Sequence, residues 1–299
     1  MTRMNSPDGA SELRMAMPES ADDLARRVER ERTVVTRHRE RELEAIALPP
    51  GRVGSVKYLN AVPLTRGIED QVVFATPARL AEMLRAGELD AALVSVTEVL
   101  LHDLYDVLDG IAVASLGQVL SVFLAYRPPL EQVRQVFCDT ASLTSVALLK
   151  VLLAERGLKP EFLPLANYAE AAQQEAVLLI GDPALDFLRA PHEHQIWDLG
   201  AEWSELTKLP FVYAVWALRR GVETKPLRHA LREAKTFGLE TLDYTITSRA
   251  EYDLEFRRDY LSWHIHYHLG ADEKRGLAKF IELLRTHGYG PLYEPRYVS

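Results

Sequence analysis

Short apolar runs alternate with longer segments of helical spacing between residues 52 and 218 of the chain. Apolar runs of four to eight residues bounded by turn residues are typical of buried strands, and apolar positions three or four apart are typical of helices. The alternation predicts an α/β fold built on a parallel or mixed sheet. The predicted strands are residues 72–75, 91–96, 111–115, 120–126, 136–139, 162–165, 177–180 and 196–199, and residues 211–218 form a long apolar segment.

Segment 53–64 opens the first of these units. Val56 and Tyr58 continue a period-two alternation, which predicts a half-buried strand, and Pro63 suits the first turn of a following helix. Asn60 then lies in a strand-to-helix loop, where open α/β sheets usually bind ligands. Taken alone, this residue fits a turn or capping role better than a binding role.

A second unit of the same kind runs through residues 136–145 into the apolar segment 146–153. Hydroxyls of Ser142, Thr144 and Ser145 crowd the expected start of this helix, where backbone N–H groups and the helix dipole favour an anion. A carboxylate or phosphate would fit there. Ordinary N-capping, which needs one of these hydroxyls, explains the cluster equally well.

Two further candidates lie next to apolar strands. Ser121 follows Gly117 closely and could face a cleft, although a buried serine bonded to the backbone is the commoner case. Gly181 and Asp182 end a buried strand with a carboxylate, a favoured place for a functional group, and capping of the next helix is the competing role.

Beyond residue 218 the pattern becomes wholly helical, with helices expected at 225–242, within 251–269 and at 272–287. Two α/β units followed by helices predict two lobes joined by crossing strands, with a ligand between them. The expected division is a polar, charged arm or helix at residues 1–50, one lobe from 51–120 plus 218–299, and a second lobe from 121–217.

Composition narrows the function. The 299 residues are 47% hydrophobic, enough for a sizeable core, and a net charge of −8 without a basic patch argues against nucleic acid as a partner. Cys138 is the only cysteine, so no internal disulfide forms and a reducing cytoplasm is expected. Apolar runs of the ~20 residues needed to span a membrane are lacking, and no secretory signal is recognised.

Metal and cofactor chemistry find little support. His264, His266 and His268 alternate, but the surrounding pattern is helical and leaves only the first and third on one face. Cys138 has no histidine nearby in sequence, and phosphate-binding glycine motifs are missing. The remaining candidates are amides and hydroxyls near helix starts, which suit a small organic anion.

Taken together, several motifs resemble one family, the chorismate dehydratases of the futalosine route to menaquinone. The resemblance runs from about residue 52 to about residue 288 with the motifs in order. They are Tyr58-Leu59-Asn60 with Pro63-Leu64, Gly87-Glu88-Leu89-Asp90, Gly117 to Ser121, Thr144-Ser145-Val146, Leu179-Ile180-Gly181-Asp182, Asp198-Leu199-Gly200 with Trp203, and Leu209-Pro210-Phe211-Val212-Tyr213-Ala214-Val215-Trp216.

The resemblance implies a two-lobed fold of the type II periplasmic-binding-protein class. It also implies dehydration of chorismate to 3-[(1-carboxyvinyl)oxy]benzoate without metal or organic cofactor. Asn60 and Ser121 would then be catalytic, with Asn60 assisting departure of the C4 hydroxyl and the enolpyruvyl carboxylate of the substrate acting as base. The substrate-binding residues would be Tyr58, Leu59, Thr144, Ser145, Gly181 and Asp182.

Two positions depart from the family pattern. Lys57 replaces a small residue, and Lys208 stands where glycine is usual, which casts doubt on a tight positive-φ turn there. Three alternatives remain open. The first is a solute-binding protein of the same fold, against which the missing export signal argues. The second is the related dihydroxynaphthoate synthase, whose Ser-Pro-Cys-Pro-Asn-Asp opening is absent, and the third is a ligand-sensing regulator, for which residues 1–50 offer no convincing helix-turn-helix.

Overall fold

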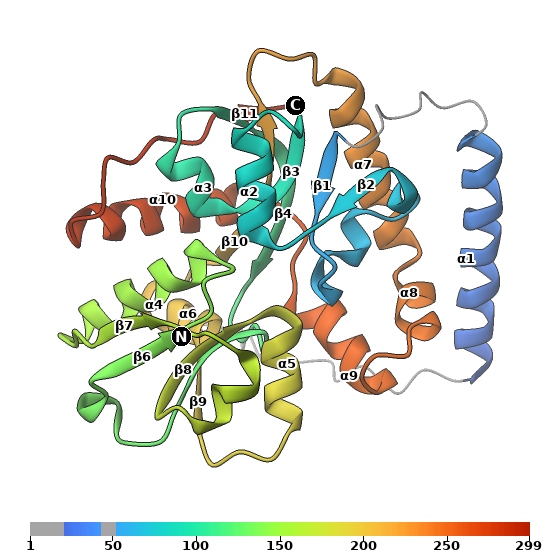
Figure 1. Cartoon of the computed structure of the whole chain (residues 1–299). Helices are drawn as coiled ribbons and strands as arrows, with labels where there is room; N and C mark the ends of the chain where they lie inside the picture. Colours follow the sequence, from blue (N-terminus) through green and yellow to red (C-terminus); the bar gives the residue numbers. More distant parts are fainter. Residues whose placement is uncertain (1–20, 43–51) are drawn as a thin grey trace, which may run out of the picture.

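The computed structural model describes residues 21–42 and 52–299, and its strands form two separate sheets (Figure 1). The six-stranded sheet has the order β11-β4-β10-β3-β1-β2, and the five-stranded sheet has the order β7-β6-β8-β5-β9. We call the parts built on these sheets lobe 1 and lobe 2. The strands are β1 Val53–Ser55, β2 Val72–Phe74, β3 Ala91–Ser95, β4 Tyr105–Ser115, β5 Val122–Tyr126, β6 Gln135–Cys138, β7 Glu161–Pro164, β8 Ala176–Ile180, β9 Gln195–Asp198, β10 Phe211–Arg219 and β11 Tyr297–Val298.

Helices cover both sheets and fill the right-hand side of Figure 1. The α-helices are α1 Ala21–Glu42, α2 Pro77–Arg85, α3 Val96–Leu101, α4 Leu143–Glu155, α5 Gly181–Arg189, α6 Leu199–Thr207, α7 Lys225–Glu240, α8 Leu242–Ser248, α9 Leu254–Asp259 and α10 Ala271–Thr286. Short 3₁₀ helices are η1 Leu59–Leu64, η2 Glu69–Gln71, η3 Leu130–Gln132 and η4 Tyr168–Gln173, and η5 Tyr260–His264 is a π-helix.

Both sheets are mixed, as the alternation of strands and helices predicts. In lobe 1, β1 is parallel to β2 and β3, while β10 runs antiparallel between β3 and β4. In lobe 2, β6 is parallel to β7 and β8, while β5 is antiparallel to β8 and β9. The chain therefore crosses between lobes twice, once from β4 to β5 and once before β10. Because β10 belongs to the lobe 1 sheet, the expected lobe boundary at residue 217 falls too late.

The opening segment differs from its prediction. β1 ends at Ser55 instead of continuing through Tyr58, and the chain enters the 3₁₀ helix η1 at Leu59, with Pro63 inside this helix rather than in a first turn. The cause is close packing of η1 on α7. A Cβ added to Gly238 of α7 would lie 1.8 Å from the carbonyl oxygen of Pro63, so the two backbones touch.

The C-terminal part is not wholly helical. α7 and α10 match two predicted helices within a few residues, but in the 251–269 stretch α9 and η5 stop at His264. His266 then forms an isolated antiparallel bridge with Ala114 of β4, and β11 adds an edge strand parallel to β4. These segments pair with the open edge of β4 because the backbone N–H and C=O groups there need hydrogen-bond partners.

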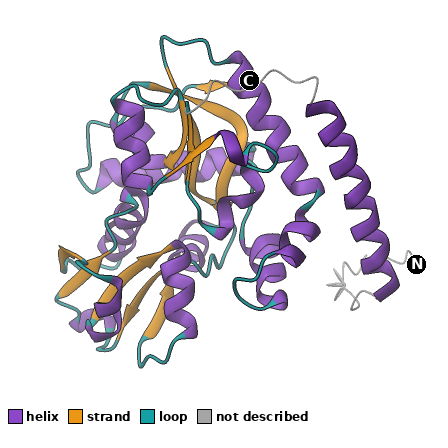
Figure 2. Cartoon of the chain, turned by 45° about the vertical axis from the view of Figure 1, so that its right-hand side comes forward, coloured by secondary structure: helices purple, strands orange, loops and turns teal. Residues whose placement is uncertain are grey.

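Helix α1 forms part of the predicted N-terminal arm and lies along the outer side of α7 and α8 (Figures 1 and 2). Arg27 pairs with the carboxylate of Asp243 at 2.7 Å, and the buried carboxylate of Glu31 accepts the Asp243 N–H at 3.1 Å. The rest of the predicted arm, residues 1–20 and 43–50, lies outside the described residues.

Candidate functional site

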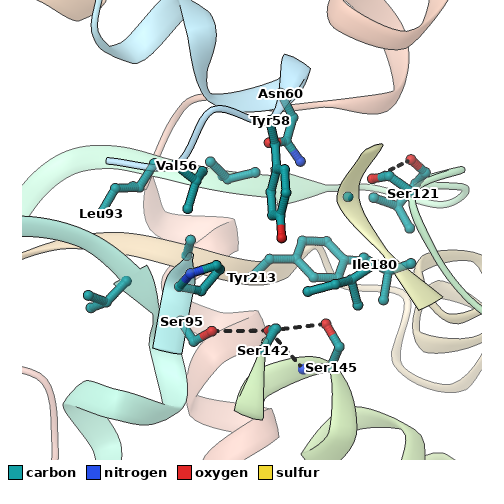
Figure 3. A pocket seen from close by; sticks show the side chains of 17 residues that line it. Val56, Tyr58, Asn60, Leu93, Ser95, Ser121, Ser142, Ser145, Ile180 and Tyr213 are labelled. Atoms are coloured by element: carbon teal, nitrogen blue, oxygen red, sulfur yellow. Dashed lines mark hydrogen bonds between the residues drawn. The ribbon is translucent and has the colours of Figure 1, made fainter. Parts of the chain in front are cut away.

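A cavity between the two lobes collects many of the candidate side chains (Figure 3). The space between its lining atoms is about 570 Å³, including solvent at its mouth. Only about 60 Å³ of it is wide enough to hold the centre of a water molecule. That is room for a few waters. The predicted site residues in its lining are Tyr58 and Asn60 from lobe 1 and Ser121, Ser145 and Gly181 from lobe 2.

Gly181 begins α5 and lies against the ring of Tyr58 across the gap between the lobes. Its φ is +60°, and an added Cβ would lie 2.9 Å from two ring carbons of Tyr58. The N–H of Gly181 donates to the carbonyl of Ser121 at 2.8 Å. Glycine is thus required here twice, by the positive φ and by the tyrosine ring.

Hydroxyl groups line the opposite side of the cavity at the N-terminus of α4. Ser142 caps this helix by accepting the Ser145 N–H at 3.4 Å, and the two hydroxyls lie 3.3 Å apart. Ser95 of lobe 1 joins them, with its Oγ 3.0 Å from that of Ser142 (Figure 3). The first turn of a helix carries N–H groups without intrahelical partners, so this end of the cavity favours an anion.

Asn60 and Ser121 each lie near the phenol of Tyr260, and the fully buried Ser121 hydroxyl donates to the Val119 carbonyl at 3.5 Å. Tyr260 is fully buried on η5, and burial raises the pKa of its hydroxyl, while hydrogen bonding with Ser121 and Asn60 opposes the rise. At strict hydrogen-bond distances this hydroxyl has no partner among the described residues, so the three groups are neighbours rather than a closed network. A π-helix at this position agrees with the frequent use of such irregular turns at functional sites.

Three predicted substrate-binding residues do not line the cavity. The Thr144 hydroxyl is buried and accepts the Thr97 N–H at 3.0 Å, which ties α4 to α3. The carboxylate of Asp182 accepts the Leu59 N–H at 3.0 Å, and the Leu59 side chain belongs to the core. Sequence spacing alone does not distinguish these supporting side chains from those that face the cavity.

Two polar residues of the lining were not predicted for the site. Ser95 ends a buried strand, β3, where a hydroxyl carries no distinctive signal. Tyr213 lies within a long apolar run and looks like a core residue, yet its hydroxyl is 3.2 Å from that of Ser115 and its side chain faces the cavity. In the sequence, the one signal for Tyr213 is its place in the motif of residues 209–216 that resembles the chorismate dehydratase family.

The cavity lining is mainly apolar, with a few neutral polar side chains, and it carries no formal positive charge, since no lysine, arginine or histidine of the described residues lines it. Burial raises the pKa of the Tyr58 phenol, and the carboxylates of Asp139 and Asp182 raise it further. Tyr58 therefore stays protonated at neutral pH and can only donate or accept hydrogen bonds. The two lysines that depart from the family pattern do not line this cavity, and Lys57 lines a different one. Lys208 does adopt the positive-φ turn that its side chain had made doubtful, with φ 58°.

The histidine series takes a different form from its prediction. His264 and His268 do not share a helical face, because η5 ends at His264 and the next helix, α10, begins only at Ala271. The Nδ1 of His264 lies 2.8 Å from the carbonyl oxygen of Gln118, and the Nδ1 of His268 lies 3.1 Å from the ammonium of Lys235. Within residues 21–42 and 52–299, no three His, Cys, Asp or Glu side chains are grouped to hold a metal ion.

Cys138 is buried at the end of β6, and burial raises the pKa of its thiol to about 12. A thiol with such a pKa is not a nucleophile at neutral pH.

Of the helices in the described ranges, none has the length and apolar character needed to cross a membrane.

Comparison by sequence gives a family. Residues 51–286 match the model of a family described as menaquinone biosynthesis. A chorismate dehydratase of Thermus thermophilus is 35% identical over 275 residues, covering 82% of this chain and 99% of that protein. A chorismate dehydratase of Campylobacter jejuni is 28% identical over 236 residues, covering 77% of this chain and 91% of that protein.

Comparison by structure gives the fold. The protein AF1704 from Archaeoglobus fulgidus superposes with a TM-score of 0.61 at 19% identity, covering 79% of this chain and 97% of that one. The alkanesulfonate-binding protein SsuA from Xanthomonas axonopodis pv. citri, solved with MOPS, gives a TM-score of 0.57 at 16% identity, covering 80% and 94%. The chain thus has the α/β, two-lobed fold of periplasmic binding proteins.

Proposed function

Because the chain belongs to the menaquinone biosynthesis family, we propose that it is an enzyme, a chorismate dehydratase. It would remove water from chorismate to give 3-[(1-carboxyvinyl)oxy]benzoate, at the start of the futalosine route. Two relatives named as chorismate dehydratases support this, one of them 35% identical over most of this chain. The observation that carries the proposal is the agreement of that similarity with an interlobe cavity lined by one amide and several hydroxyls.

The chemistry asks little of the protein beyond positioning. A proton leaves C3, hydroxide leaves C4 with a proton as water, and the ring becomes aromatic. Aromatisation supplies much of the driving force, so holding the dianion in a reactive pose and stabilising developing charge account for the remaining catalysis. Such a reaction is compatible with a cavity lined by neutral polar groups.

The first turn of α4, with Ser142 and Ser145, would hold one substrate carboxylate. This replaces the role expected for Thr144, whose hydroxyl is engaged with Thr97. Asn60, from lobe 1, would donate a hydrogen bond to the departing C4 hydroxyl, with Ser121 beside it. The phenol of Tyr260 would hold both side chains in place from behind the cavity wall.

The base would be the enolpyruvyl carboxylate of the substrate, turned toward its own C3 proton. No carboxylate or imidazole of the described residues lines the cavity, which is why an internal base is preferred. Proton removal would come first and loss of the C4 hydroxyl second, through a carbanion that Ser121 and Asn60 stabilise. Since the free space is narrow, the lobes must separate for entry, and the two crossing segments would act as the hinge.

The test is incubation of chorismate with the purified full-length chain, followed by mass spectrometry. Chelator-treated protein should give a product lighter by one water, with the ultraviolet absorbance of a substituted benzoate. Unchanged chorismate that nevertheless binds would contradict the proposal and favour a solute-binding protein of this fold. Activity that returned only after a metal was added would contradict the cofactor-free mechanism.

A further inference from the structure

A second cavity lies beside the first and has no part in the proposed reaction. It is confined to lobe 1, between η1, β2 and α8. The space between its lining atoms is about 730 Å³, including solvent at its mouth. Val56 lines both cavities and so forms part of the wall between them. The segment that follows Val56 carries Tyr58 and Asn60, so the second cavity adjoins the backbone that positions the candidate site.

The charged side chains that line this cavity are mainly cationic. Lys57, Arg66 and Arg249 contribute three positive charges, and Glu69 is the one acidic residue among the described lining side chains. The interlobe cavity has no charged lining residue, so the two cavities differ in chemistry. Guanidinium and ammonium groups gathered around a hollow are the usual partners of phosphate and carboxylate groups.

Arg66 is held in place by aromatic rings and by an ion pair. Its guanidinium lies over the rings of Phe237 and Tyr244, 5.4 Å and 4.9 Å from their centroids. It pairs with one oxygen of Glu69 at 3.5 Å, and the other oxygen of that carboxylate accepts the Gly67 N–H at 2.7 Å. The Nε of Arg66 has no partner among the described residues, so it can still donate a hydrogen bond.

Two groups on α8 and at its end are also unsatisfied. Arg249 pairs through one nitrogen with Glu251, and its Nε has no partner in the described part of the chain. Thr245 is 3% exposed, lines the cavity, and its hydroxyl likewise has no partner within that part. Buried polar atoms are nearly always bonded, so an unpaired hydroxyl beside cationic side chains can offer a hydrogen bond to a bound molecule.

The wall carrying these groups is braced by α1. Glu31 and Arg27 of α1 hold Asp243, the residue before Tyr244, by a hydrogen bond and an ion pair. Helix α1 lies outside the residues that match the family model, 51–286. This contact next to the cavity wall is therefore made by a helix outside the family-matching region.

We infer that this second cavity binds a small oxyanion carrying two negative charges, with its phosphate or carboxylate oxygens paired to Lys57, Arg66 and Arg249. The Thr245 hydroxyl would give a further neutral hydrogen bond. This inference does not rest on dehydration of chorismate. It rests on the charge, the unpaired donors and the preorganised guanidinium of Arg66.

Isothermal titration calorimetry of the full-length chain tests it, with inorganic phosphate and succinate as separate probes at low ionic strength, where charge pairing is least screened. Saturable binding of at least one probe is expected, with a Kd on the order of 0.1 to 1 mM. Lys57→Gln and Arg249→Gln should each weaken it about tenfold, since each removes a charge-assisted hydrogen bond. Arg275→Gln, at an exposed ion pair on α10, is the matched control and should leave the Kd unchanged.

Ser145→Ala distinguishes anion binding in the second cavity from binding in the interlobe cavity, because Ser145 lines only the interlobe cavity. Binding that survives in this variant and is weakened in the two charge variants supports the inference, and the preferred probe identifies the acidic group. Thr245→Val keeps the side-chain shape and should raise the Tm while weakening binding. Absence of saturable binding by either probe, or loss of binding in Ser145→Ala alone, would overturn it.

Discussion

The carboxylate of Asp182 in lobe 2 accepts the backbone N–H of Leu59 in lobe 1 at 3.0 Å, one residue before Asn60. Burial raises the pKa of Asp182, and the Leu59 N–H opposes that rise. The bond therefore spans the interlobe gap at the segment that carries the candidate catalytic amide. We propose that Asp182 positions this segment rather than contacting a ligand.

Asp182→Ala should lower kcat for chorismate about tenfold and change KM less, because Asn60 loses its anchor to the opposite lobe. Asp182→Asn keeps an acceptor oxygen without the buried charge and should retain most of the activity. Steady-state kinetics of both variants, with circular dichroism to monitor folding, make the comparison. Equal activities in the two variants would show that the hydrogen bond does not matter.

Asn60→Ala should reduce kcat by a factor of about 10² or more, as loss of one oriented donor at a developing charge usually does. Asn60→Asp preserves the shape but replaces the N–H donor by an acceptor, so it should be equally inactive. Thermal melts of both variants should stay close to the parent, since the residue is only half-buried. Full turnover by either variant, measured by product formation, rules out the proposed role.

Gly181→Ala should damage activity more than stability. The added Cβ would sit 2.9 Å from the Tyr58 ring at a φ of +60°, so the ring must move within the cavity. We expect at least a tenfold loss in kcat/KM and about 1 to 3 kcal/mol of lost stability from backbone strain. Gly157→Ala, at a positive φ with open space around it, is the matched control for strain alone and should keep activity.

Lys208→Gly should stabilise the protein. Lys208 ends α6 in the left-handed region, with φ 58° and ψ 26°, a conformation that costs a residue with a Cβ about 1 to 2 kcal/mol. Partial relief should raise the Tm by roughly 2 to 4 °C for a domain of this size. Lys208→Ala retains the Cβ and should show no such rise, which distinguishes backbone strain from loss of the lysine charge in a differential scanning experiment.

Lys235 should make stability rise with pH above about 8. Burial lowers its pKa to about 8, with nearby Arg232 adding to the effect, whereas the unfolded chain holds that proton to about 10.5. Between these values the unfolded state binds more protons, so deprotonation favours the folded state. Cys138 acts oppositely from about pH 9, because its folded pKa is raised to about 12.

Comparison with Lys235→Met isolates the lysine, since Cys138 is common to both proteins. In chemical denaturation, the unfolding free energy of the parent should rise relative to that of Lys235→Met as the pH increases from 8 to about 10. Lys279→Met, at an exposed ion pair with Glu282, controls for loss of surface charge. A difference that is constant with pH would contradict the lowered pKa.

Local patterning determined much of the fold. Apolar runs placed most strands within one or two residues, and α7 and α10 begin within one residue of the helices predicted at 225–242 and 272–287. These features depend on neighbours in sequence, which is why periodicity and capping chemistry reveal them. The end of β1 was wrong because contact with Gly238, more than 170 residues away, decides the path of η1.

The sequence by itself determined the family, the two-lobed α/β architecture and the set of amides and hydroxyls from which a site is made. The tertiary structure alone decided which of them face the cavity. Thr144 and Ser145 are neighbours on one helix start, yet one hydroxyl bonds Thr97 and the other faces the gap. Tyr260 reaches Asn60 and Ser121 from a distant segment. Side-chain direction depends on how the lobes and the C-terminal segments pack, and such long-range contacts leave no local pattern in the chain.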